Sequence, residues 1–137
     1  MPHIRRLLET SLYCDDVAVT TGFYARLLER PPMMASDRVV AFDAGGGTVL
    51  LLFQRGACAR PIRLAGGVVP GHDGAGPTHL AFAIDTGDLA AWEDRLTALG
   101  IAVESRVEWT GGGRSLYFRD PDGRSVELAT PGTWPSY

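Results

Sequence analysis

A weak internal repeat is the feature that most constrains how this chain of 137 residues can fold. Residues 9–15 resemble residues 79–85, at an offset of 70 positions. Further along, residues 38–42 resemble residues 114–118, at an offset of 76 positions. A helical pattern follows the first segment in each half. Two similar units of about half the chain each predict a pseudo-twofold fold, in which equivalent positions converge on one axis.

Hydrophobic periodicity assigns similar elements to the two halves. The first half is expected to contain a helix that Asp16 or Thr20 caps and that runs to about residue 28. Its strands are expected over residues 8–15, 39–43 and 48–54, the last two joined by a glycine-rich turn.

The second half is expected to contain a helix that Asp88 caps and that stops at Gly100. Strands are expected over residues 101–108 and 114–119, and the turn at residues 120–123 leads into the last strand. Both halves thus alternate strand and helix before a run of strands.

The repeat places metal-capable side chains at related positions. By the two offsets, Glu9 corresponds to His79, and Leu51 corresponds to Glu127. His79 and Glu127 lie within apolar or alternating strands, where a buried ionisable side chain needs a partner or a metal ion. Three of the four symmetry-related positions therefore hold potential metal ligands.

Motifs over nearly the whole chain are typical of one protein family. The most specific is Tyr-Phe-Arg-Asp-Pro-Asp-Gly at residues 117–123, followed by Glu127. Further motifs are residues 12–16, Phe23-Tyr24, Leu27-Leu28 and residues 76–82. By these residues the chain resembles the vicinal oxygen chelate superfamily, which includes glyoxalase, fosfomycin-resistance, bleomycin-resistance and extradiol-dioxygenase proteins. The resemblance implies an α+β fold of two βαβββ modules, whose curled mixed sheet surrounds a metal or ligand cavity.

The resemblance also implies a metal site. Carried over residue by residue, the ligands of one divalent cation fall on Glu9, His79 and Glu127. Two departures stand out: the first-strand ligand is usually His or Gln, and the fourth ligand of glyoxalase I enzymes falls on Leu51, which cannot coordinate a metal. One imidazole and two carboxylates suit Zn²⁺, Ni²⁺, Mn²⁺, Co²⁺, Fe²⁺ or Mg²⁺.

In such a site the cation acts as a Lewis acid towards a substrate with neighbouring oxygens. Glu9 and Glu127 are the candidates for a catalytic base, since glyoxalase-type enzymes use a ligand glutamate in that way. We expect substrate contacts from Tyr117 or Arg114, whichever points inward, from Trp109 and from His72. Trp109 could instead pack on the rim of the site, and His72 could simply be exposed.

The length predicts a single domain over residues 1–137, with module one at about 7–56, a linker at about 57–76 and module two at about 77–131. The stretch from residue 55 to 77 is rich in glycine and proline and reads as irregular. It is either a plain connection between the modules or a functional loop.

Charge and composition limit the classes of molecule that the chain is expected to bind. A net charge of −3 gives no support for nucleic-acid binding, and no window approaches the length of a transmembrane helix. The N-terminus lacks the apolar stretch of a signal peptide, and the two cysteines predict no disulfide. We therefore expect a cytoplasmic protein with a small-molecule substrate, and no partnership with nucleic acid or membrane.

The residues and the resemblance together favour a metal-dependent enzyme acting on a small oxygen-rich or aromatic metabolite, by isomerase, lyase, transferase or dioxygenase chemistry. The alternative is a metal-free drug-binding resistance protein of the bleomycin-resistance type, and a more distant one is a dimeric ferredoxin-like αβ barrel. A homodimer is expected. In it, Glu9 meets His79 and Glu127 either across the two subunits or within one chain.

Overall fold

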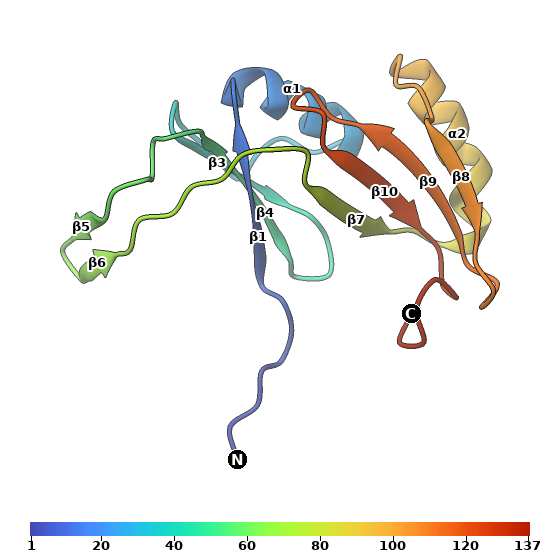
Figure 1. Ribbon diagram of the computed structural model, residues 1–137, viewed down its shortest axis with the longest axis horizontal. Coiled ribbons are helices and arrows are strands. Elements are labelled where there is room, and N and C mark those ends of the chain that lie inside the picture. The colour runs from blue at the N-terminus through green and yellow to red at the C-terminus, as the bar shows by residue number, and fades with distance from the viewer. The chain divides into compact units, whose positions relative to one another are not determined.

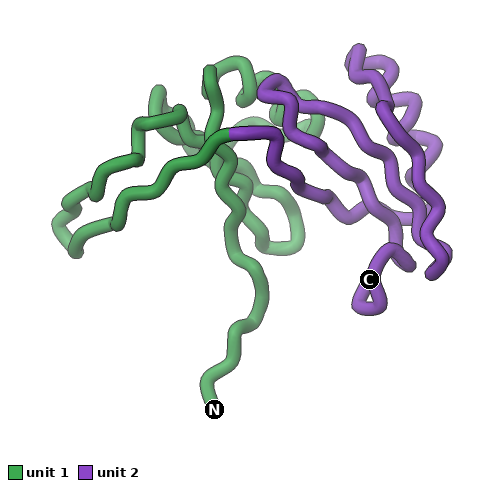
Figure 2. The backbone as a smooth tube through the Cα atoms, viewed as in Figure 1, with its two compact units in different colours: residues 1–75 green, residues 76–137 purple.

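Two segments of the chain, residues 1–75 and residues 76–137, form separate units in the computed structural model, which describes residues 1–137 (Figure 2). Each unit contains one four-stranded mixed sheet and one α-helix (Figure 1). The predicted α+β class with two βαβββ modules is confirmed. Neither α-helix has the length and apolar character needed to cross a membrane.

The first unit has the strand order β1-β4-β3-β2. Strands β1 and β4 run parallel, and the other two pairs are antiparallel. Its elements are β1 (Glu9–Cys14), α1 (Val17–Leu28), β2 (Met34–Ala35), β3 (Val39–Asp43) and β4 (Val49–Gln54).

The second unit repeats this topology with the order β7-β10-β9-β8, in which β7 and β10 are the parallel pair. Its elements are β7 (His79–Ala83), the short 3₁₀ helix η1 (Thr86–Asp88), α2 (Leu89–Ala98), β8 (Ser105–Glu108), β9 (Arg114–Arg119) and β10 (Ser125–Ala129).

The strand registers reproduce the offsets of the sequence repeat. Ser11 on β1 lies opposite Leu51 on β4, and Ala81 on β7 lies opposite Glu127 on β10. The antiparallel pairs also agree, since Ala41 is opposite Leu51 just as Tyr117 is opposite Glu127. Equivalent residues therefore occupy equivalent places in the two sheets.

Helix α1 covers one face of the first sheet. The Asp16 side chain caps the helix by accepting hydrogen bonds from the backbone N–H groups of Ala18 and Val19. The apolar face of α1 is buried, as are the alternate strand residues Leu12, Cys14, Val40, Phe42, Leu50 and Leu52. Because strand side chains alternate between faces, Glu9 lies on the face that α1 leaves uncovered.

Helix α2 is tied to the second sheet by an ion pair between Glu93 and Arg106 on β8. Leu96 is fully buried, as are the alternate residues Leu116, Phe118, Val126 and Leu128 of β9 and β10. Asp88 precedes α2 as predicted, but its side chain makes no capping hydrogen bond. The strand predicted from residue 101 begins only at Ser105.

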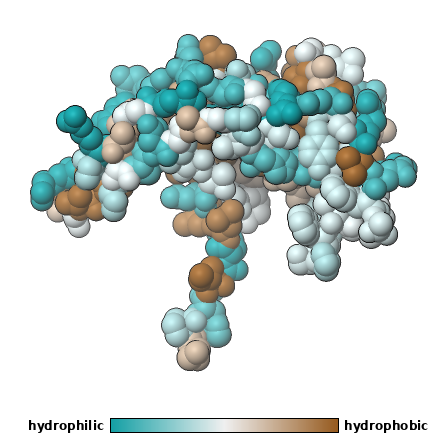
Figure 3. Space-filling view, viewed as in Figure 1, coloured by the Kyte–Doolittle hydropathy of each residue, from teal (hydrophilic) through white to brown (hydrophobic).

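The stretch between the modules is more ordered than its composition suggests. It contains a hairpin of β5 (Ile62–Leu64) and β6 (Gly67–Val69), which extends away from the sheet of the first unit (Figure 1). Figure 3 shows hydrophobic atoms on this hairpin and on the N-terminal segment, where Leu64, Val68, Ile4 and Leu7 are exposed. The two strands of the hairpin are short and exposed, so they leave no burial periodicity in the sequence.

Candidate functional site

His79 and Glu127 meet on the sheet face of the second unit that lies away from α2. His79 begins β7, and Glu127 lies on the neighbouring strand β10. The His79 Nε2 atom is 3.2 Å from Glu127 Oε2. The carboxylate side chain is almost entirely buried, whereas half of the imidazole surface is exposed. The pair therefore has one buried and one accessible ligand group.

A backbone contact fixes the tautomer of His79. Its Nδ1 atom lies 2.9 Å from the carbonyl oxygen of Ser125. Because a carbonyl oxygen only accepts hydrogen bonds, Nδ1 carries the hydrogen, and in the neutral ring Nε2 keeps its lone pair. Two electron-rich atoms, Nε2 and the Glu127 oxygen, then face each other and need a proton or a cation between them. Metal-binding histidines show this same contact of the second ring nitrogen.

Glu127 is held by hydroxyl groups from β9. The Ser115 hydroxyl donates a hydrogen bond of 2.5 Å to Glu127 Oε1, and the Trp109 indole N–H donates one of 2.8 Å to Ser115. The Tyr117 ring stacks against His79 with centroids 6.2 Å apart. Burial, the hydrogen bond to Glu127 and the charge of Glu127 raise the pKa of Tyr117 above its ordinary value.

The structure places Tyr117 and Arg114, the two alternative substrate contacts on β9, on opposite faces of the sheet. Tyr117 lies opposite Glu127 and shares its face of the sheet, whereas Arg114 points to the other face and pairs with Glu108 at 3.5 Å. Of the two predicted substrate contacts, only Tyr117 is brought to the cluster. Ser115 also lies on this face, as strand alternation from Tyr117 predicts, although it belongs to no motif that marks it as a site residue.

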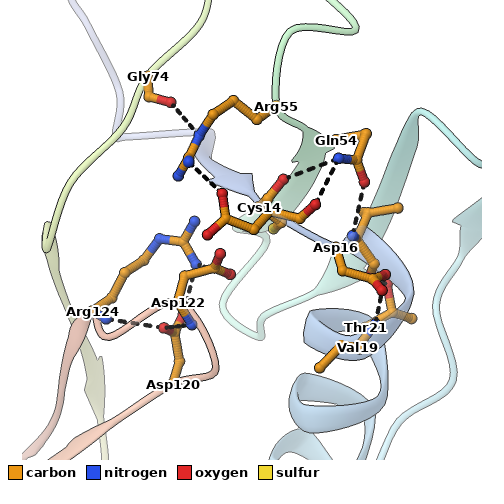
Figure 4. A network of polar contacts seen from close by, with 12 residues as sticks. Cys14, Asp16, Val19, Thr21, Gln54, Arg55, Gly74, Asp120, Asp122 and Arg124 are labelled. Atoms are coloured by element: carbon orange, nitrogen blue, oxygen red, sulfur yellow. Dashed lines mark hydrogen bonds and ion pairs between the residues drawn. The ribbon is translucent and has the colours of Figure 1, made fainter.

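The turn that precedes Glu127 is held by a buried ionic cluster. Arg124 donates to Asp120 at 2.8 Å and to Asp122 at 3.0 Å, and all three side chains are buried (Figure 4). Asp120 also accepts from the backbone N–H groups of Asp122 and Arg124. The predicted turn is thereby fixed immediately before β10.

In the first unit, Glu9 begins β1 and is exposed. Strand alternation places Glu9 on the same face of the sheet as Ser11 and Tyr13, the face away from α1. Leu51 of β4 lies opposite Ser11. No three His, Cys, Asp or Glu side chains gather into a group that could hold a metal ion. The structure thus brings two of the three predicted ligands together, and Glu9 belongs to the other unit.

His72 lies against aromatic residues of the first unit. Its Nδ1 atom is 2.7 Å from the Tyr13 hydroxyl, and its ring meets the edge of Phe53 with centroids 4.7 Å apart. Arg55 donates to the carbonyl of Gly74 at 3.3 Å and pairs with Asp15 (Figure 4). The segment around His72 therefore packs on the same sheet face that carries Glu9.

A pocket of about 460 Å³ lies elsewhere in the second unit. Its walls come from the loop after β8 and from the C-terminal segment, and they include Thr110, Gly111, Gly132, Thr133, Trp134, Pro135 and Tyr137. None of the predicted site residues lines it. His79 and Glu127 are not part of this pocket.

Known proteins resemble the chain over most of its length. The family described as the Glyoxalase/Bleomycin resistance protein/Dioxygenase superfamily matches residues 3–128. A metallothiol transferase FosB from Bacillus licheniformis is 31% identical over 117 residues, which are 85% of this chain and 69% of that protein. The FosB of Shouchella clausii is 30% identical over 113 residues, which are 80% and 68% of the two chains.

A solved structure agrees with the fold as well. The crystal structure of lactoylglutathione lyase from Agrobacterium tumefaciens matches with a TM-score of 0.86 and 30% identity, over 96% of this chain and 98% of that one. The fosfomycin resistance protein FosX from Listeria monocytogenes matches with a TM-score of 0.67 at 21% identity, over 93% and 94% of the two chains. At that identity the second likeness concerns the fold alone.

Proposed function

Because the chain belongs to the glyoxalase/bleomycin resistance protein/dioxygenase superfamily, we propose that it is a divalent-metal-dependent enzyme that transfers a thiol to a small oxygen-rich molecule. The observation that carries this proposal is the facing pair of His79 Nε2 and Glu127 Oε2. The names metallothiol transferase and lactoylglutathione lyase both refer to thiol compounds, which favours a thiol as one reactant.

The residues present fit a divalent cation. In its neutral form His79 offers the lone pair of Nε2, because Nδ1 donates to Ser125, and Glu127 offers the carboxylate oxygen that Ser115 does not engage. Glu9, at the position equivalent to His79, supplies the third ligand in this proposal. It comes from the same chain or from a second copy in a homodimer. Three protein ligands leave coordination positions for water or substrate.

When bound, the cation supplies Lewis-acid stabilisation of charge on a substrate oxygen. The net reaction forms a bond from the thiol sulfur to carbon and breaks a carbon–oxygen bond, whose electron pair and the thiol proton go to the oxygen. Glu9 is the better candidate to take the thiol proton, since it is exposed while Glu127 is held by Ser115. A tyrosine hydroxyl is protonated at neutral pH, and the burial and the Glu127 contact that raise the pKa of Tyr117 reinforce this state, so Tyr117 can donate one hydrogen bond, either to Glu127 or to a substrate oxygen on the same sheet face.

The position of Leu51 bears on the choice of reaction. Leu51 occupies the place equivalent to Glu127 in the first sheet and offers no ligand atom. The chain therefore lacks the fourth ligand that the glyoxalase I resemblance calls for, and isomerisation of a glutathione adduct of methylglyoxal is disfavoured. The likeness to the two FosB proteins, at 30–31% identity, favours transfer of a thiol instead.

Loss of free thiol tests this function. The protein is loaded with Mn²⁺, Zn²⁺, Ni²⁺ or Co²⁺ and mixed with cysteine or glutathione and a panel of small electrophiles that carry adjacent oxygens. We expect metal-dependent thiol consumption that His79→Ala abolishes and that His3→Ala, at the exposed N-terminus, leaves intact. Robust turnover of methylglyoxal with glutathione would contradict the proposal. A wild-type protein that binds no metal would leave the metal-free binding protein as the better account.

A further inference from the structure

The two oxygens of Glu127 have different surroundings. Oε1 accepts the hydrogen bond from Ser115, while Oε2 faces His79. The Glu127 side chain is only 7% exposed. A carboxylate can rotate about its terminal torsion unless its oxygens are distinguished by their partners. Ser115 supplies that distinction.

The direction of the hydrogen bonds follows from what each group can donate. An indole N–H only donates, so Ser115 Oγ accepts from Trp109. An ionised carboxylate only accepts, so Ser115 gives its single hydrogen to Glu127. Trp109 therefore leaves the serine hydroxyl with one favoured orientation, which points at Oε1.

The loop that carries Trp109 is itself held in place. The Trp109 backbone N–H donates to Gly113 O at 2.8 Å, and Gly112 N–H donates back to Trp109 O at 2.9 Å. A methyl group at Gly113 would lie 2.2 Å from the backbone nitrogen of Thr133, and one at Gly111 would lie 2.4 Å from Gly132 O. Glycine at these positions lets the loop pack directly on the C-terminal backbone, which restrains the indole.

We propose that Trp109 and Ser115 are positioning residues, which hold Glu127 Oε1 so that Oε2 stays directed at the metal position beside His79. This inference rests on the proposed metal-dependent function. It gives Trp109 a role through its indole N–H, beside the substrate contact expected from the sequence. Outer hydrogen bonds of this kind orient metal ligands in proteins.

The experiment uses Ser115→Ala and Trp109→Phe, singly and together. Trp92→Phe on α2 and Ser105→Ala on β8 are matched controls, because Trp92 lies on another element and Ser105 is an exposed residue of the same sheet. Trp109 is 38% exposed, so its replacement is tolerated even if Ser115→Ala lowers stability. Co²⁺ affinity is measured by titration of the visible spectrum. The Glu127 carboxylate ¹³C resonance is measured in the metal-free proteins.

Ser115→Ala should lower Co²⁺ affinity by about 10- to 100-fold, the usual effect of removing an outer-shell contact. Trp109→Phe should lower it less, and the double variant should bind no more weakly than Ser115→Ala, because Trp109 acts only through Ser115. Both single variants should shift the Glu127 resonance, and the controls should leave affinity and resonance unchanged.

Several results would overturn the positioning role. The role is excluded if Ser115→Ala and Trp109→Phe both leave the Co²⁺ affinity and the Glu127 resonance unchanged. The proposed function would not be affected by that result. Fully additive losses in the double variant would show that Trp109 acts independently of Ser115. If the wild type binds no Co²⁺, the proposed function falls, and the Glu127 resonance in the metal-free variants still decides whether Trp109 and Ser115 position the carboxylate.

Discussion

His79 is the residue on which the proposed metal site most depends, because it supplies the accessible ligand atom of the pair. Half of its side-chain surface is exposed, so its loss removes little packing. His79→Ala should therefore abolish stoichiometric metal uptake and leave the fold intact. Isothermal titration with Mn²⁺ and circular dichroism check the two parts, with His3→Ala as control. Undiminished metal binding by His79→Ala would exclude it as a ligand.

Metal affinity should also depend on pH. One imidazole nitrogen and two carboxylates must be free of protons to bind a cation, so protons and metal compete. Affinity should fall steadily as the pH is lowered from about 8 to about 5, and proton release should accompany binding. Titrations at several pH values in buffers of different ionisation enthalpy measure both effects. An affinity that is independent of pH would argue for a site built from other groups.

The sequence predicted the equivalent positions of the two modules, but not the hydrogen bonds around Glu127. The registers of β1 with β4 and of β7 with β10 confirm the equivalences of Glu9 with His79 and of Leu51 with Glu127. The internal sequence repeat was sufficient to predict these equivalences. The link from Trp109 through Ser115 depends on side-chain rotamers and on the path of a glycine-rich loop, which hydrophobic patterns do not encode.

Among the elements, the turn between β9 and β10 carries the ionic cluster of Arg124. Asp120→Ala should destabilise the protein by about 3–5 kcal/mol, because it leaves the buried guanidinium without a main partner. Urea unfolding followed by circular dichroism measures the change. A loss of stability no larger than that caused by Glu104→Gln would show that the cluster contributes little.

Glu104→Gln is the matched control, since Glu104 pairs with Arg119 at an exposed site. The hydrogen bond from Arg119 lowers the pKa of Glu104, despite an opposing effect of desolvation. The small stabilisation from this pair is therefore present above the ordinary carboxylate pKa and is lost as the pH falls through the lowered value. At neutral pH the unfolding midpoint of Glu104→Gln should change far less than that of Asp120→Ala.

The loop after β8 offers a second test at this scale. Gly113→Ala should cost about 1–3 kcal/mol, because its methyl group meets the backbone of Thr133 at 2.2 Å. Gly22→Ala in α1 meets no atom within 4 Å and should stabilise the helix by about 0.5–1 kcal/mol. Thermal unfolding of the two variants should thus move in opposite directions. Equal shifts would mean that the loop yields to the methyl group.

Elements with a buried face were predictable, and elements without one were not. Helix α1 and strands β3, β4 and β9 lie where periodicity placed them, because each buries alternate or helically spaced apolar residues. The hairpin of β5 and β6 and the two-residue strand β2 are exposed, so their sequences carry no such pattern. Their pairing depends on neighbouring strands and turns instead.

For the molecule as a whole, the sequence predicted the two modules from a repeat, and the topology confirms them. How Glu9 reaches the other ligands depends on the association of modules, which local patterns do not determine. The single domain with its linker at 57–76 and the homodimer therefore stay predictions. Light scattering at micromolar concentration should give twice the chain mass of 14.7 kDa. A strict monomer would leave association within one chain as the route to the site.

The metal content of the wild-type protein shows whether His79, Glu127 and Glu9 form a metal site. Equilibrium dialysis against a divalent cation, followed by elemental analysis, gives the number of ions bound per chain. We expect one ion per chain, which is lost when His79 or Glu127 is replaced and bound more weakly when Glu9 is replaced. Wild-type protein that retains no divalent ion under these conditions would contradict it.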